Sequence, residues 1–155
     1  GSSSRLTSMP EFLPDRLEAG THNMPGISGL YEGIKFVGKT GPSKILSHER
    51  TLLKNAVRLL ESTGGLSLYI SDDLECQSGV LSFKIEGKPC ETVAEELSKK
   101  GIAVRAGLHC APLAHETAGT AETGTVRASF SVFNSIRDVN VFALAVKEIA
   151  ARKAQ

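Results

Sequence analysis

One cysteine, Cys110, stands in a setting that suits nucleophilic chemistry. It lies in the segment RAGLHCAPLA, residues 105–114, directly after His109 and five residues after Arg105. The thiolate is the reactive form of cysteine, and a neighbouring cation lowers the pKa of a thiol. His109 and Arg105 are the candidate cations, so the pattern predicts a reactive thiolate at Cys110. The alternative is a small buried thiol without a chemical role, which is the interpretation we favour for Cys76 and Cys90.

A second candidate, Arg127, lies in the segment TVRASFSVF, residues 125–133. Strand alternation places Val126, Ala128 and Phe130 on one face and Arg127 on the other. A guanidinium binds a carboxylate through two parallel hydrogen bonds. If the preceding loop folds back over this strand, Cys110 and Arg127 face one small acid. The alternative is an exposed arginine on an amphipathic strand.

Two further groups of residues bear on cofactor and metal binding. Gly20 and Thr21 offer a backbone N–H and a hydroxyl, which suit a phosphate oxygen, although such a pair also forms simple turns. His109, Cys110 and His115 are close in sequence. They lack the paired spacing of a metal site, so we predict no metal.

The elements that position these residues follow from periodicity and from helix-boundary signals. Four helices are predicted. The first follows the apolar stripe at 27–37 and ends at Gly38, and the second runs from Ser43 to the pair Gly64 and Gly65. The third covers 89–100, and the fourth begins after the N-cap Ser135, with Asp138 at N3. Strands are predicted at 66–70, 80–85, 102–105 and 125–133. The loop 106–124 exceeds the roughly 12–15 residues of ordinary loops and is rich in Ala, Gly and Thr, so it is predicted to be mobile and functional.

This order of elements predicts an α+β fold. A short, mostly antiparallel sheet with helices packed on one face is the economical arrangement. Residues 1–25 contain three prolines and little periodicity, so they are predicted to form an extended arm. Residues 26–155 are predicted to form the small α+β domain.

Composition excludes several classes of protein. The chain has 155 residues, 41% of them hydrophobic and 23% charged, with a net charge of +1, which does not suggest a nucleic-acid partner or an anionic membrane surface. No apolar run is long enough to cross a bilayer. Three cysteines do not form a disulfide framework, and this favours a reducing, cytoplasmic location.

Three motifs together resemble a known family. The segments RLEAGTHN (16–23), GIAVRAGLHCAPLA (101–114) and VRASFSVFNS (126–135) occur in the order seen in the C-terminal part of cysteine desulfurases. These are pyridoxal 5′-phosphate enzymes of the class V aminotransferase group, of fold type I. The resemblance extends over nearly all of residues 10–152.

The resemblance implies a role for each matching position. Cys110 matches the cysteine that attacks the substrate sulfur and carries a persulfide, and Arg127 matches the arginine that holds the substrate carboxylate. Gly20 and Thr21 match the pair that reaches the cofactor phosphate across a dimer interface. The implied reaction converts L-cysteine to L-alanine. Arg105 and His109 match motif positions for which the resemblance assigns no role.

The chain also departs from the family pattern. His22 stands where proline is usual, and Leu108 stands where some members have a second histidine. The loop after Cys110 diverges from better-known members, so the sulfur acceptor is not specified. No lysine lies in the context of the family's Schiff-base lysine, which belongs to the N-terminal cofactor domain.

We therefore expect the chain to be inactive without that domain, to form a homodimer, and to contribute its arm to the cofactor-domain side. Two alternatives stay open at this point: a class V aminotransferase domain that needs no nucleophilic cysteine, and a stand-alone sulfur-carrier or binding module.

Overall fold

The computed structural model describes residues 8, 10–18 and 20–152, and the chain divides into two compact units, residues 1–42 and 43–155. Part of the predicted arm, namely residues 1–7, Met9 and Ala19, lies outside the described residues. Within the rest of the arm, a short 3-10 helix spans Asp15–Leu17.

In the first unit, α1 spans Met24–Thr40. It begins at Asn23, whose side chain accepts a hydrogen bond from the Gly26 amide at 3.0 Å. The predicted end at Gly38 is wrong, because the helix continues to Thr40 and is capped by Gly41. Gly41 has a φ of 89°, a conformation that glycine adopts without steric cost, and its amide closes the last turn on the Val37 carbonyl. The predicted apolar stripe of α1 is exposed to between 42% and 65%, at Ile27, Leu30, Tyr31, Ile34 and Val37.

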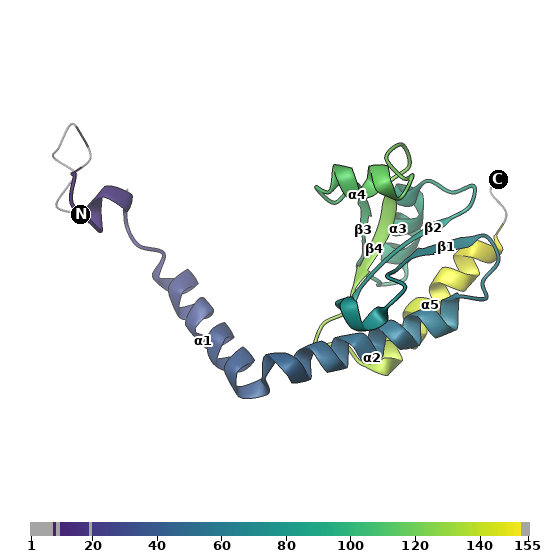
Figure 1. Cartoon of the computed structure of the whole chain (residues 1–155), viewed down its shortest axis with the longest axis horizontal. Helices are drawn as coiled ribbons and strands as arrows, with labels where there is room; N and C mark the ends of the chain where they lie inside the picture. Colours follow the sequence, from purple (N-terminus) through teal and green to yellow (C-terminus); the bar gives the residue numbers. More distant parts are fainter. Residues whose placement is uncertain (1–7, 9, 19, 153–155) are drawn as a thin grey trace. The chain divides into compact units, whose positions relative to one another are not determined.

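The second unit contains one antiparallel sheet, which confirms the predicted fold class (Figure 1). The strands are β1 (Leu66–Tyr69), β2 (Val80–Ile85), β3 (Arg105–Gly107) and β4 (Thr125–Ser129), and their order is β1-β2-β4-β3. The register pairs Phe83 of β2 with Val126 of β4 on the core face. On the opposite face, Arg127 of β4 lies between Ser82 of β2 and Arg105 of β3.

Three strands differ in extent from the prediction, and β1 ends at Tyr69 rather than at residue 70. The strand expected at 102–105 instead spans Arg105–Gly107, because the Ile102 amide bonds to the Leu97 carbonyl and stays in the turn that ends the preceding helix. The last strand ends at Ser129 rather than at residue 133.

Three helices and the buried face of the sheet together form the core. The helices are α2 (Pro42–Leu60), α3 (Cys90–Lys99) and α5 (Ile136–Ala151). Helix α2 begins one residue before the predicted cap Ser43 and ends before the predicted glycine pair. The predicted N-cap Ser135 of α5 is confirmed, and the structure adds a capping box, since Ser135 and Asp138 bond reciprocally. Among the described residues, no helix is long and apolar enough to cross a membrane.

The prediction of an unstructured loop at 106–124 is wrong in part, because the segment contains the end of β3 and a short helix, α4 (Pro112–Thr117). Pro112 sits at the start of α4, where its fixed φ suits the first helical turn. The loop also has its own small interior, since His115 and Thr120 are buried. Thr120 is therefore packed inside the loop, whereas the composition of the loop indicated mobility.

Candidate functional site

Cys110 is presented on a tight turn at the end of β3. His109 and Cys110 both have positive φ values, 53° and 58°, a region that few non-glycine residues occupy. The Ala111 amide closes the turn on the Leu108 carbonyl at 3.0 Å. The Cys110 thiol is free and exposed, so the alternative of a buried structural thiol is wrong for this residue.

The other two cysteines differ from each other. Cys90, at the start of α3, is buried, and burial together with the neighbouring Glu91 raises the pKa of its thiol. This thiol is structural, as predicted. Cys76 is exposed, and its thiol donates to the Asp73 carboxylate at 3.3 Å, so the prediction of a buried thiol is wrong there.

His109 does not supply the cation that the sequence suggested. Burial lowers the pKa of His109, and the nearby positive charges of Arg127 and Arg105 lower it further, so the ring is neutral at pH 7. The ring is instead an anchor: Nε2 lies 3.2 Å from the Thr125 carbonyl and 3.3 Å from the Thr125 hydroxyl. Its Nδ1 is buried without a hydrogen-bond partner among the described residues.

Arg127 lies on the sheet face opposite the core, as predicted. Its Nε is buried and makes no hydrogen bond within the described part of the chain. Arg105 lies directly across from it in the β3–β4 register, so two like charges oppose each other, which destabilises a sheet unless an anion is bound. An unsatisfied buried donor also costs free energy. Both features fit the binding of a carboxylate at this position.

The structure brings some of the predicted residues together. Arg105, His109 and Arg127 meet where β3 pairs with β4, and Cys110 follows His109 directly. Gly20 and Thr21 belong to the first unit, where both are exposed. A Cβ placed on Gly20 would contact nothing within 4 Å, so a phosphate group has room to approach its backbone.

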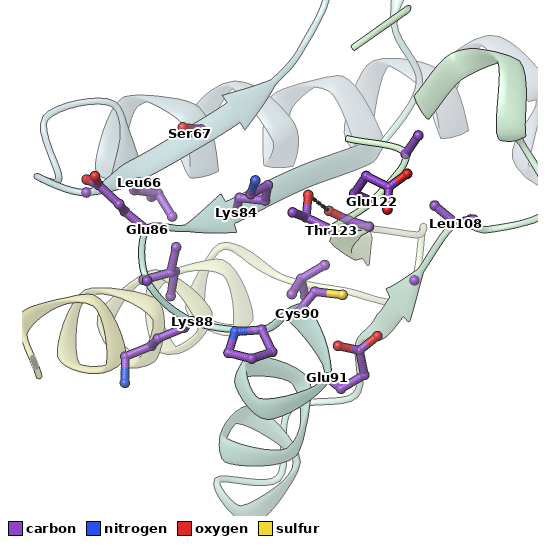
Figure 2. Close-up of a pocket in the computed structure, with 18 residues that line it drawn as sticks. Leu66, Ser67, Lys84, Glu86, Lys88, Cys90, Glu91, Leu108, Glu122 and Thr123 are labelled. Atoms are coloured by element: carbon purple, nitrogen blue, oxygen red, sulfur yellow. Dashed lines mark hydrogen bonds between the residues drawn. The ribbon is translucent and has the colours of Figure 1, made fainter. Parts of the chain in front are cut away.

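A cleft of about 1120 Å³ lies beside the Cys110 turn rather than on it. Its lining includes Gly107 and Leu108, which precede the turn, and the region around Cys90 at the start of α3. Figure 2 shows Lys84, Glu91 and Glu122 among the charged side chains around it. The predicted nucleophile and the predicted carboxylate-binding arginine do not line this cleft.

Sequence reasoning missed the part played by His115, which it considered only as a metal ligand. The side chain is buried, and its Nδ1 lies 2.7 Å from the Thr120 hydroxyl. The signal in the sequence was a histidine and a threonine five residues apart in a supposed loop, which is too weak to predict burial. Among the described residues, no group of three or more His, Cys, Asp or Glu side chains could hold a metal ion.

Comparison with known proteins gives a consistent result. The family model described as Aminotransferase class-V matches residues 6–142. A probable cysteine desulfurase of Pyrococcus abyssi is 38% identical over 136 residues, and one of Mycolicibacterium paratuberculosis is 36% identical over 137 residues. Each alignment covers 88% of this chain, but 33% and 19% of those relatives. The chain therefore spans between a fifth and a third of their length.

Solved structures agree. The apo structure of a cysteine desulfurase from Thermococcus onnurineus matches 88% of this chain and 34% of that chain, with a TM-score of 0.80 and 36% identity. The cysteine desulfurase CsdA of Escherichia coli, solved in an S-sulfonic acid form, matches 87% of this chain and 32% of that chain, with a TM-score of 0.75 and 32% identity.

Proposed function

Because the chain belongs to the class V aminotransferase family, we propose that it forms the C-terminal part of a pyridoxal 5′-phosphate-dependent cysteine desulfurase. The proposed reaction converts L-cysteine to L-alanine and leaves the sulfur on Cys110 as a persulfide. The observation that carries the proposal is the position of the Cys110 thiol, which is exposed on a strained turn. The preceding residue, His109, anchors this turn to β4, the strand that bears Arg127. Relatives named as cysteine desulfurases support the same assignment.

The proposed roles follow from the groups that are present. The Arg127 guanidinium binds the substrate carboxylate, which satisfies its unpaired Nε. The Cys110 thiolate attacks the substrate sulfur: an S–S bond forms, the Cβ–S bond breaks, and the electron pair of that bond stays with the carbon skeleton, which takes up protons and leaves as alanine. Pyridoxal 5′-phosphate, when bound, supplies the electron withdrawal that makes this bond labile.

The chain's own contribution to the cofactor is small. Gly20 and Thr21 are exposed, with open space beside Gly20, and they would hold the phosphate through an amide and a hydroxyl. Neutral His109 contributes no positive charge beside Cys110, which leaves Arg105 as the remaining cation of the sequence pattern.

The apolar face of α1 supports the proposal that another polypeptide packs against this chain. Its exposed residues Ile27, Leu30, Tyr31 and Ile34 form one helical stripe, and contiguous apolar surface of this kind marks an interaction surface. We propose that the N-terminal cofactor domain covers this stripe and that the assembled enzyme is a homodimer. Three free cysteines are consistent with a reducing, cytoplasmic location.

Reconstitution tests the proposal. The chain joined to an N-terminal cofactor domain, with pyridoxal 5′-phosphate, L-cysteine and excess dithiothreitol, is expected to form alanine and sulfide in equal amounts. The dithiol reduces the Cys110 persulfide, releases its outer sulfur as sulfide and is itself oxidised to a disulfide. Cys110→Ser should abolish both products, whereas Cys76→Ser, which alters the other exposed thiol, should leave them unchanged. Unchanged desulfuration by Cys110→Ser would refute the role of the thiol, and intact transamination would favour an aminotransferase.

Two outcomes address the remaining expectations. Turnover by residues 1–155 alone would refute the dependence on a cofactor domain. Transfer of sulfur to Cys110 from a persulfide donor without cofactor, detected as a mass increase on the peptide, would favour the stand-alone sulfur carrier.

A further inference from the structure

Two buried polar side chains pair with each other in the segment between Cys110 and β4, and the reaction outlined above does not use them. His115 is 7% exposed and Thr120 is 1% exposed. Their Nδ1 and Oγ1 atoms are 2.7 Å apart, and the Thr120 amide donates to the His115 carbonyl at 2.8 Å. Buried polar groups are costly unless they are paired, so this pair specifies one closed form of the loop. We call His115 and Thr120 the loop clasp.

The loop clasp is connected to the strand that carries Arg127. The Thr120 carbonyl accepts hydrogen bonds from the amides of Thr123 at 3.3 Å and Gly124 at 2.8 Å. Gly124 is the residue directly before β4. The clasp is therefore fixed to the sheet on this side by backbone hydrogen bonds.

The loop clasp is also connected to the Cys110 turn. The His115 amide donates to the Ala111 carbonyl at 3.2 Å, and Ala111 is the residue after Cys110. The His115 ring packs against the His109 ring with centroids 5.8 Å apart. His109, the residue before Cys110, is in turn held by Thr125. The clasp thus contacts both neighbours of the nucleophile.

The Cys110 turn needs this support because of its backbone. Two consecutive non-glycine residues, His109 and Cys110, have positive φ. Such conformations persist only where the surrounding structure holds them, and they cluster where a side chain must be aimed. The contacts that hold this turn come from Thr125 on one side and from the loop clasp on the other.

We propose that the loop clasp positions the Cys110 thiol for attack on the substrate sulfur, an inference that rests on the proposed desulfurase function. His115 and Thr120 are positioning residues: they act through the Cys110 turn and not on the substrate. Cys110 is accordingly aimed by a structured loop.

Hydrogen exchange on the 155-residue chain tests the structural half of this proposal. Thr120→Val removes the hydroxyl and keeps the side-chain shape, whereas Thr120→Ser keeps the hydroxyl. Thr117→Val is the matched control, since Thr117 lies in the same loop but is exposed and bonds only within α4, to the Leu113 carbonyl. We expect Thr120→Val to accelerate amide exchange in residues 108–124 by about tenfold. The other two variants should match the wild type.

Exchange within twofold of the wild type in Thr120→Val would overturn the clasp. If that variant unfolds the whole chain, which accelerated exchange in β2 would reveal, His115 provides the second comparison. His115→Asn places an amide near the position of Nδ1 and should retain protection, whereas His115→Ala should lose it. Equal protection in these two variants would also overturn the clasp.

Kinetics of the assembled enzyme test the functional half. A misplaced nucleophile slows the chemical step, so Thr120→Val should lower kcat for alanine formation about tenfold to a hundredfold. KM for L-cysteine should stay within twofold, because Arg127 is unchanged, and Thr120→Ser should restore kcat. An unchanged kcat in a Thr120→Val enzyme whose loop exchanges rapidly would refute positioning. An inactive wild-type assembly would refute the proposed function instead, and the exchange comparison would still decide whether the clasp exists.

Discussion

Gly124 is the position where a single added methyl group should disturb the sheet next to the Cys110 turn. Its φ is +59°, and a Cβ there would lie 3.0 Å from the Gly107 Cα and 3.1 Å from the Cys90 Sγ. The first contact is with the backbone of β3, which cannot rotate away as a side chain would. Gly124→Ala should therefore push β3 away from β4 or force α3 to shift.

The loop offers a matched control. Gly119 also has a positive φ, +65°, but a Cβ there would meet nothing within 4 Å. An alanine in this conformation costs about 1–2 kcal/mol, and the stiffer unfolded chain offsets roughly 0.4–1 kcal/mol of that cost. Gly119→Ala should therefore lower the free energy of unfolding by about 1 kcal/mol. Gly124→Ala adds overpacking of about 1–3 kcal/mol and should lower it by about 2–4 kcal/mol.

Urea denaturation of the 155-residue chain, followed by circular dichroism, measures both variants. The slope of the free energy of unfolding against urea is about 1–3 kcal/mol per molar for small proteins, so the two midpoints should differ by about 1 M. Equal midpoints for Gly124→Ala and Gly119→Ala would show that the β3–β4 junction has room for a methyl group. The close approach that fixes the Cys110 turn to the sheet would then be refuted.

Three further predictions test the site and its supports. Iodoacetamide should modify Cys76 and Cys110 in the native chain and spare Cys90, whose burial raises its thiol pKa; rapid labelling of Cys90 by mass spectrometry would contradict the packing at α3. Burial lowers the pKa of His109 below its ordinary value of 6.5, so the unfolded chain binds the proton more readily and the stability contributed by neutral His109 is lost as pH falls below about 6.5. Urea midpoints at pH 7.5 and 5.5 should show a smaller pH dependence for His109→Gln than for the wild type, and equal dependence would refute the burial argument. Ser135→Ala breaks the α5 capping box and should cost about 0.5–2 kcal/mol of unfolding free energy, whereas Ser98→Ala at an exposed site of α3 should cost nothing measurable.

Several features of this protein could be predicted from the sequence because they depend on neighbours along the chain. The apolar stripe of α5 and its Ser135–Asp138 capping box are local, since the interacting residues lie within one or two helical turns. The alternation that separates Val126 from Arg127 is likewise a property of one strand. The order of the three motifs also lies in the sequence, and it was sufficient to indicate the family.

Other features required the tertiary structure. The start of β3 depends on two features that periodicity does not show. One is its pairing with β4, and the other is the turn that ends α3. Periodicity predicted the apolar stripe of α1 correctly, but periodicity cannot tell which surface covers that stripe.

The sequence by itself determined that a thiol and a guanidinium stand at the right places along the chain, because residue type and strand period are local properties. Only the tertiary structure decided that His109 is a neutral anchor, that Arg105 faces Arg127, and that His115 is buried with Thr120. The first two facts depend on burial and on cross-strand register, which arise only when segments far apart in the chain pack together. The third depends on how the loop folds on itself, which residue types alone do not show.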